Sequence, residues 1–174
     1  HLFDDPNYRF DYYFPLKVAI KISAKYKKKY RVIIRLHDNK SQRNVINNLL
    51  KKNNAQHIEL IDTKAMPFKK IVSISDLFIN FIVSTTFYEE CISNADIFIY
   101  DNSDLTNKTK KMINNRSFWF NNIKTFSDNL NKYLDDGVFH QKSNDNSFLN
   151  ENLNWNRKSE IAQNTYNTVK NIIE

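Results

Sequence analysis

Glycine is nearly absent from this chain. Its 174 residues include one glycine, Gly137, and one cysteine, Cys91. Walker A loops and GxGxxG fingerprints need several glycines, because the backbone must come close to a phosphate, so both kinds of nucleotide-binding loop are excluded. A single cysteine also excludes an internal disulfide and fits a reducing compartment. Because Cys91 falls on a predicted helix, we expect a buried, inert thiol rather than a nucleophile.

Two further features are missing from the sequence. No apolar run approaches the roughly 20 residues that a membrane-spanning helix needs. The 4 histidines have no spacing typical of a zinc site. Ordinary turn chemistry explains acidic residues such as Asp101 and Asp104 better than metal binding does. We therefore expect neither a metal nor another cofactor.

Positive charge is plentiful and unevenly placed. Lys and Arg number 26 against 19 Asp and Glu, which gives a formal net charge of +7. Much of it gathers in residues 25–31 (Lys-Tyr-Lys-Lys-Lys-Tyr-Arg), which we call the basic cluster. Solvated helix ends explain the smaller lysine pairs elsewhere. The basic cluster could instead face nucleic acid or an anionic membrane.

Hydrophobic patterning predicts an α/β fold. Apolar runs at residues 31–36, 56–61, 77–83 and 97–100 have the composition of strands, and the segments between them have helical spacing. Strands that alternate with helices indicate βαβ units and a parallel sheet. We therefore expect a Rossmann-like parallel sheet with helices on both faces, followed by a C-terminal helical segment.

The same patterning suggests how the chain is organised. We expect a connecting arm over residues 1–15, a Rossmann-like domain over 16–136, a polar loop over 137–155, and a C-terminal helix over 156–174 that packs on the domain. Two local predictions lie inside the domain. The aromatic residues 118–120 could stack a base or sugar, but core packing explains them better. Ser127 is the expected N-cap of a helix that runs to Leu134.

Polar residues follow the predicted strands at one end of the sheet, where doubly wound sheets bind ligands. Hydroxyls and helix-start amides can bind a phosphate without glycine, and a histidine at a strand exit can donate to a phosphate oxygen. The candidates for phosphate or donor binding are Arg35, His37, Ser84, Thr85, Thr86 and Glu89.

Simpler explanations exist for each of these candidates. On spacing alone, helix capping explains Ser84 and Thr85 at least as well as ligand binding does. His37 has the alternative of an ordinary polar turn residue. Glu89 could bind ribose hydroxyls or be an exposed helix-surface carboxylate, and for the adjacent Glu90 we expect exposure.

Four segments together resemble a known family. Residues 32–37 (VIIRLH), 75–79 (SDLFI), 84–89 (STTFYE) and 97–101 (IFIYD) are similar in order and spacing to the carboxyl-terminal half of GT-B glycosyltransferases. The resemblance is closest to bacterial surface-polysaccharide enzymes, including the sialyltransferase-like and capsule-synthesis groups, and covers roughly residues 30–101.

The resemblance implies roles for several residues. His37, Ser84 and Thr85 would contact the phosphate of a nucleotide-sugar donor, and Glu89 would lie near its ribose or sugar. Two positions depart from the family pattern: Asp38 replaces the usual proline, and Asn94 stands where a glycine commonly precedes the last strand.

The resulting functional expectation is a donor-binding domain. The catalytic residues are unknown. In such enzymes the catalytic base usually comes from an N-terminal domain of the same polypeptide, so we expect this chain to be a fragment of the enzyme. We also expect the reaction to be metal-independent. The expected partners are a nucleotide-sugar donor and a glycan or lipid-linked acceptor, at a cytoplasmic location with peripheral contact to an anionic membrane. Two alternatives stay open: an alditol-phosphate (glycerophosphate) transferase domain, and a non-catalytic, basic nucleic-acid-binding module.

Overall fold

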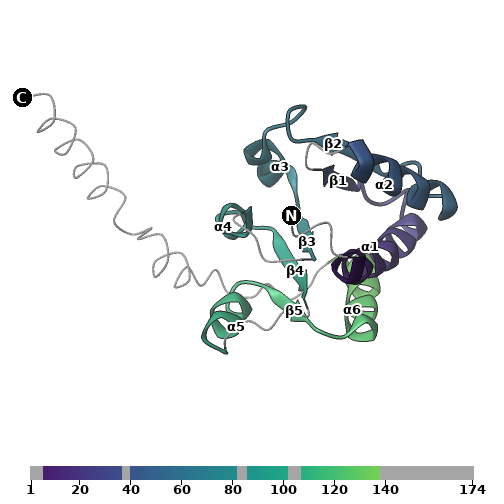
Figure 1. Cartoon of the computed structure of the whole chain (residues 1–174). Helices are drawn as coiled ribbons and strands as arrows, with labels where there is room; N and C mark the ends of the chain where they lie inside the picture. The colour runs from purple at the N-terminus through teal and green to yellow at the C-terminus, as the bar shows by residue number, and fades with distance from the viewer. Residues whose placement is uncertain (1–5, 37–39, 82–85, 102–106, 138–174) are drawn as a thin grey trace, which may run out of the picture.

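The computed structural model of the chain describes residues 6–36, 40–81, 86–101 and 107–137 (Figure 1). The helices are α1 (Pro6–Lys25), α2 (Lys40–Lys52), α3 (Phe68–Ile74), α4 (Thr86–Cys91), α5 (Asn107–Asn114) and α6 (Ile123–Asp136). The strands are β1 (Ile33–Leu36), β2 (Glu59–Asp62), β3 (Leu77–Asn80), β4 (Asp96–Tyr100) and β5 (Phe118–Phe120). Helices and strands therefore alternate along the chain, as the sequence predicts.

The strands form two parallel sheets. In the first, β1 pairs with β2, with Ile34 opposite Leu60. In the second, the order is β3-β4-β5, with Phe78 opposite Ile97 and Phe98 opposite Phe118. The predicted fold class, a Rossmann-like α/β architecture with parallel strands, is confirmed, although the expected sheet is divided in two.

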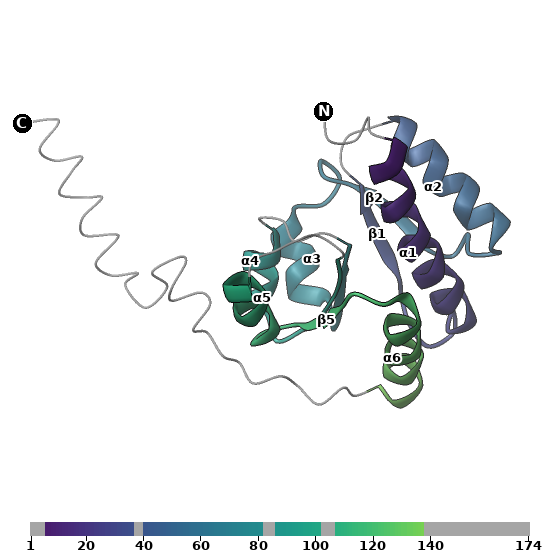
Figure 2. The same cartoon turned by 60° about the horizontal axis from the view of Figure 1, so that its bottom comes forward.

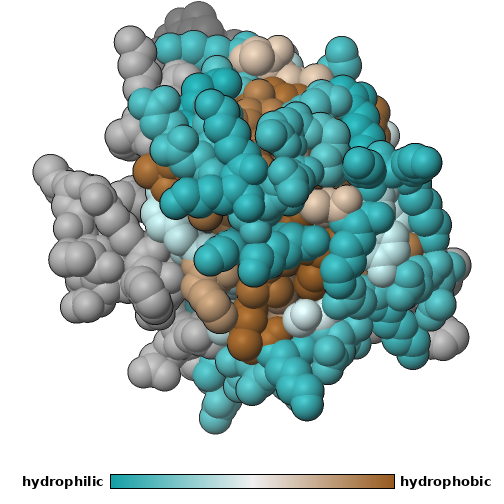
Figure 3. All heavy atoms as spheres, turned by 90° about the vertical axis from the view of Figure 1, so that its right-hand side faces the viewer, coloured by the Kyte–Doolittle hydropathy of each residue, from teal (hydrophilic) through white to brown (hydrophobic). Residues whose placement is uncertain are grey.

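Helices cover both faces of the sheets, and three hydrophobic clusters hold the layers together. One cluster joins α3, α4 and α5 to β3 and β4. A second joins α1 and α6 to β4 and β5, and a third joins α1 and α2 to β1. Helices α3, α4 and α5 thus lie on one side of the strands and α1, α2 and α6 on the other (Figure 2). The face formed by α1, α2 and α6 is hydrophilic over much of its surface, with hydrophobic atoms visible between the teal groups (Figure 3).

Helix α1 begins earlier than expected. We predicted an arm up to residue 15 and a helix from Leu16, but α1 starts at Pro6 and continues through Pro15. A proline suits the first turn of a helix, where its missing N–H has no partner to lose. Inside a helix it breaks a backbone hydrogen bond. Here Pro15 is buried and is followed by the core residues Leu16 and Ile20, so tertiary packing maintains the helix across it.

The end of the described chain also differs from the expectation. The cap of α6 is Asn122 rather than Ser127, since the Asn122 Oδ1 accepts hydrogen bonds from the backbone N–H groups of Lys124 (2.9 Å) and Thr125 (3.2 Å). The helix ends at Asp136, where the predicted domain ends too. Gly137 follows in the left-handed conformation with a φ of 72°, and its N–H donates to the Tyr133 carbonyl. The predicted polar loop, apart from Gly137, and the predicted helix over 156–174 lie outside the described residues.

The aromatic residues 118–120 belong to the core. They form β5, which pairs with β4, and the Phe98 ring lies 5.5 Å from that of Phe118 and 5.2 Å from that of Phe120. Phe120 is buried and Phe118 packs against the same cluster. The core interpretation of these aromatics is therefore confirmed.

Candidate functional site

A cleft separates the two sheets. It has a volume of about 1690 Å³ and is lined by consecutive residues of β1 on one side and β3 on the other. Among the described residues, β1 pairs only with β2 and β3 only with β4, so each presents its other edge to the cleft. Phe81, directly after β3, packs against the cluster that contains Leu36, the last residue of β1. The cleft lining runs from Arg31 to Arg35 on the β1 side and from Ser75 to Phe81 on the β3 side.

The cleft lies where the winding of the fold reverses. From β1 the chain crosses to β2 in one direction, and from β3 it proceeds through β4 to β5 in the other. In doubly wound folds, this reversal opens a crevice at the carboxyl ends of the strands, where ligands bind. The cleft follows both strands along their length, and the predicted position of the site at the strand ends stays a prediction.

Arg35 is the predicted site residue with the most clearly defined surroundings in the structure. It is the third residue of β1 and lines the cleft. Its guanidinium lies over the Phe68 ring, with Cζ 4.7 Å from the ring centroid. Its Nε is buried and has no hydrogen-bond partner among the described residues. A buried donor without an acceptor is unfavourable, and the positive charge of the Arg35 guanidinium would attract an anion that enters the cleft.

Thr86 and Glu89 also line the cleft, both from α4. Thr86 is the first residue of this helix, and Glu89 is exposed on its surface. Helix α4 has only 6 residues, so its N-terminus alone does not make an anion-binding site. The Arg35 guanidinium is the stronger candidate for binding an anion. The structure thus brings Arg35, Thr86 and Glu89 to one cleft. The other predicted residues, His37, Ser84 and Thr85, lie outside the described residues.

Glu90, which we expected to be exposed, is instead buried and lines the cleft. The exposed fraction of Glu90 is 2%, whereas the neighbouring Glu89 is exposed. The spacing explains the difference: Phe87, Glu90 and Cys91 stand at positions i, i+3 and i+4, so they share one face of α4, and that face packs on the core. The helical period was the signal that could have identified Glu90 from the sequence.

The environment of Glu90 changes its acidity. Burial raises the pKa of Glu90 to about 7; the hydrogen bond from Asn80 and the positive charges of Arg116 and Arg35 oppose this rise, whereas Glu89 adds to it. The Asn80 Nδ2 donates to Glu90 Oε2 at 2.5 Å. Glu90 is therefore a carboxyl that changes its charge near neutral pH, a property often found at functional sites.

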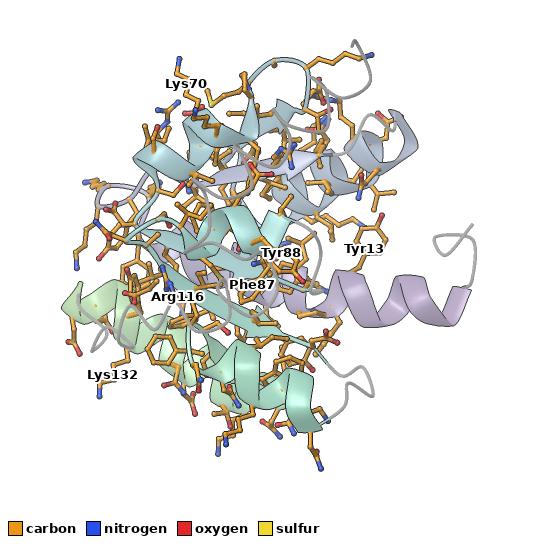
Figure 4. The ribbon with its side chains drawn as sticks, turned by 90° about the vertical axis from the view of Figure 1, so that its left-hand side faces the viewer. Tyr13, Lys70, Phe87, Tyr88, Arg116 and Lys132 are labelled. Carbon is orange, nitrogen blue, oxygen red and sulfur yellow. The ribbon has the colours of Figure 1, made fainter. Side chains whose placement is uncertain are left out.

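Arg116 holds the loop that follows α4. Its Nη2 donates to the carbonyls of Ser93 (2.6 Å) and Ala95 (2.9 Å), and its Nε donates to the Cys91 carbonyl (3.3 Å). It lies in the interior of the molecule, whereas Lys70 and Lys132 lie at its edge (Figure 4). These bonds fix α4 against β4, and thereby fix Glu90 in the cleft.

Cys91 is buried as predicted. Its exposed fraction is 3%, and burial raises the pKa of its thiol to about 12. A thiol with such a pKa is almost entirely protonated at neutral pH and is a poor nucleophile. The prediction of an inert thiol is consistent with both observations.

Much of the basic cluster is engaged within the molecule. The Lys29 ammonium donates to the carbonyls of Leu134 and Asp135 at 2.8 and 2.7 Å, and the Tyr26 hydroxyl donates to the Asp135 carboxylate at 2.7 Å. The Arg31 guanidinium makes two hydrogen bonds of 2.8 Å to Glu59. The cluster therefore has a structural role in joining α1 to α6 and β1 to β2. Binding of nucleic acid by its other lysines stays a prediction.

The comparisons with known proteins add no family. No model of a protein family, no curated protein and no solved structure matches the chain. The described part of the chain contains no group of three His, Cys, Asp or Glu side chains placed to hold a metal ion. It contains no helix long and apolar enough to cross a membrane. The fold and cleft define the class: a Rossmann-like α/β chain with an open crevice at its point of reversal.

Proposed function

We propose that the chain is the donor-binding half of a glycosyltransferase that transfers a sugar from a nucleotide-sugar to a surface-glycan acceptor. The observation that carries the proposal is the cleft between β1 and β3, with the Arg35 guanidinium at its wall. The resemblance of residues 30–101 to GT-B enzymes supports the same assignment. The reaction would be metal-independent, with cationic and hydroxyl groups stabilising the negative charge of the departing nucleotide.

Each part of the donor has a place in this proposal. The donor phosphates would lie against Arg35 and Thr86, together with His37, Ser84 and Thr85 from the segments that follow β1 and β3. The ribose or sugar hydroxyls would approach Glu89. A base on another domain of the same polypeptide would activate the acceptor, so the chain alone would bind donor and turn over little.

The acceptor and location follow from the same proposal. A glycan or lipid-linked acceptor would bring the enzyme to the cytoplasmic face of a membrane, in a bacterium that builds a surface polysaccharide. Exposed lysines of the basic cluster could add electrostatic attraction to anionic lipids, on the order of 1 kcal/mol for each lysine near the surface.

Isothermal titration calorimetry tests the proposal with CMP-, UDP-, GDP- and CDP-linked ligands. We expect at least one ligand to bind, and Arg35→Gln to weaken that binding at least about tenfold, since a charged hydrogen bond to phosphate would be lost. The control is Arg43→Gln, because Arg43 is an arginine outside the cleft that pairs with Asp62. Absence of binding by every ligand, or unchanged binding in Arg35→Gln, would refute the proposal.

The same panel distinguishes the alditol-phosphate alternative. That enzyme would use the same kind of cleft with a CDP-linked donor. Binding of CDP-glycerol in preference to all sugar-linked ligands would therefore reassign the substrate while leaving the site in place. A combined Ser84→Ala, Thr85→Ala and His37→Ala variant tests the three predicted residues outside the described part.

A further inference from the structure

Glu90 is a buried carboxyl group in the wall of the cleft. Carboxylates are almost never fully buried unless they are paired, yet Glu90 is 2% exposed and shares its helix face with Phe87 and Cys91. Its hydrogen-bond donor is the neutral Asn80 amide. A neutral donor cannot balance a buried negative charge, so the ionised form is held at a high energy.

The charged groups around Glu90 come from three sides. Arg35 approaches from β1, Arg116 from the segment before β5, and Glu89 from the same helix. The Nε and Nη2 of Arg116 are engaged by three backbone carbonyls. Of the two arginines that act on Glu90, Arg35 is the one that lines the cleft.

An anion at Arg35 would alter the ionisation of Glu90. Both side chains line the same cleft, and the charge of Arg35 already favours the ionised form of Glu90. An anion bound at the guanidinium would offset that positive charge and add a negative charge beside the carboxylate. Both effects disfavour the ionised form.

We propose that Glu90 couples occupancy of the cleft to proton uptake, so that binding of a phosphodiester anion beside Arg35 draws a proton onto the Glu90 carboxyl. The proposal rests on the proposed function for the presence of that anion. In the unbound protein Glu90 titrates near pH 7, so a fraction of a proton is taken up there on binding. Above that pH, the affinity falls by at most about tenfold for each pH unit.

Calorimetry in buffers with different ionisation enthalpies measures this uptake. The probe is the tightest ligand of the CMP-, UDP-, GDP- and CDP-linked panel. The phosphodiester groups of these ligands do not ionise near neutral pH, so proton uptake reports on the protein. We expect a measurable uptake of less than about one proton at pH 7.5, and none in Glu90→Gln.

Asp128→Asn is the control, because Asp128 is an exposed carboxylate on α6 outside the cleft. It should retain the uptake. A second measurement, the affinity of the unmodified protein between pH 6 and 9, needs no variant and stands even where Glu90→Gln does not fold.

The two proposals can fail separately. Binding with no proton uptake and with an affinity independent of pH overturns the coupling and leaves the proposed function intact. Persistent uptake in a folded Glu90→Gln variant also overturns it, since another group then takes the proton. Absence of binding by every ligand overturns the proposed function together with the coupling.

Discussion

The two sheets differ in how completely the fold covers them. In the three-stranded half, four of the five residues of β4 are buried, and helices pack on both of its faces. In the two-stranded half, β1 buries only Leu36, and β2 has no fully buried residue. The three-stranded half therefore has the larger share of the core. The two-stranded half contributes Arg35 to the cleft and can be altered with less effect on stability.

The largest expected effect compares one substitution in the two halves. Ile99→Ala, in β4, removes a side chain with 0% exposure and should lower the free energy of unfolding by about 2–5 kcal/mol. Ile33→Ala, in the half-buried β1, should cost less than half as much, because less apolar surface is lost to solvent. Urea denaturation measures both values. Equal losses would remove the distinction between the two halves.

The next effect concerns Glu90 and pH. Because burial raises its pKa from 4.5 to about 7, the folded state binds the proton more tightly than the unfolded state does. The protonated carboxyl is favourable below about pH 4.5, and this contribution is lost as the pH rises through about 7. Glu90→Gln should thus raise the free energy of unfolding by up to about 3 kcal/mol at pH 8 and much less near pH 5.

Denaturation at both pH values provides the measurement for Glu90. Glu89→Gln serves as the control and should change little at either pH, because Glu89 is exposed. A gain for Glu90→Gln that is the same at both pH values would contradict the account.

A smaller effect is expected at the start of α6, which packs on the three-stranded half. Asn122→Ala removes the oxygen that accepts from the Lys124 and Thr125 N–H groups and should cost about 1 kcal/mol. The exposed neighbour Asn121 offers the control, since Asn121→Ala leaves this cap in place. Thermal unfolding that affects both variants equally would reject Asn122 as the cap.

The smallest effect is expected at the ion pair that joins β1 to β2. Arg31 and Glu59 are 61% and 45% exposed, so water and salt screen their attraction. A double-mutant cycle with Arg31→Ala and Glu59→Ala should give a small coupling that decreases with added salt. A coupling as large as the loss in Asn122→Ala would show that this half depends on its surface charges.

The sequence predicts the order of helices and strands because the strands are apolar runs with turn residues between them. The clearest is β4, where Ile97, Phe98 and Ile99 follow one another and are fully buried. Strand β5 has only three residues and is defined by its pairing with β4, which no local pattern reveals. The first turns of α1 were missed because Pro15 reads as a helix breaker and tertiary packing overrides that signal.

The candidate site could be predicted only in part. The strand-end rule selected Arg35, Thr86 and Glu89, which line one cleft, and their role in binding stays a prediction. The division of the sheet into two could not be predicted, since no local sequence pattern shows which strand edges pair. Glu90 was misjudged because its charge suggested exposure, although its helical spacing places it with Phe87 and Cys91.

The most direct test of the account is the location of bound donor on the protein. Backbone amide NMR shifts of the labelled chain should be recorded during titration with the tightest nucleotide-linked ligand of the panel. The account predicts shifts at the walls of the cleft, around Arg35, Asn80, Thr86 and Glu90, that saturate together. Shifts confined to the lysines of residues 25–28, or no shifts with any ligand, would contradict it.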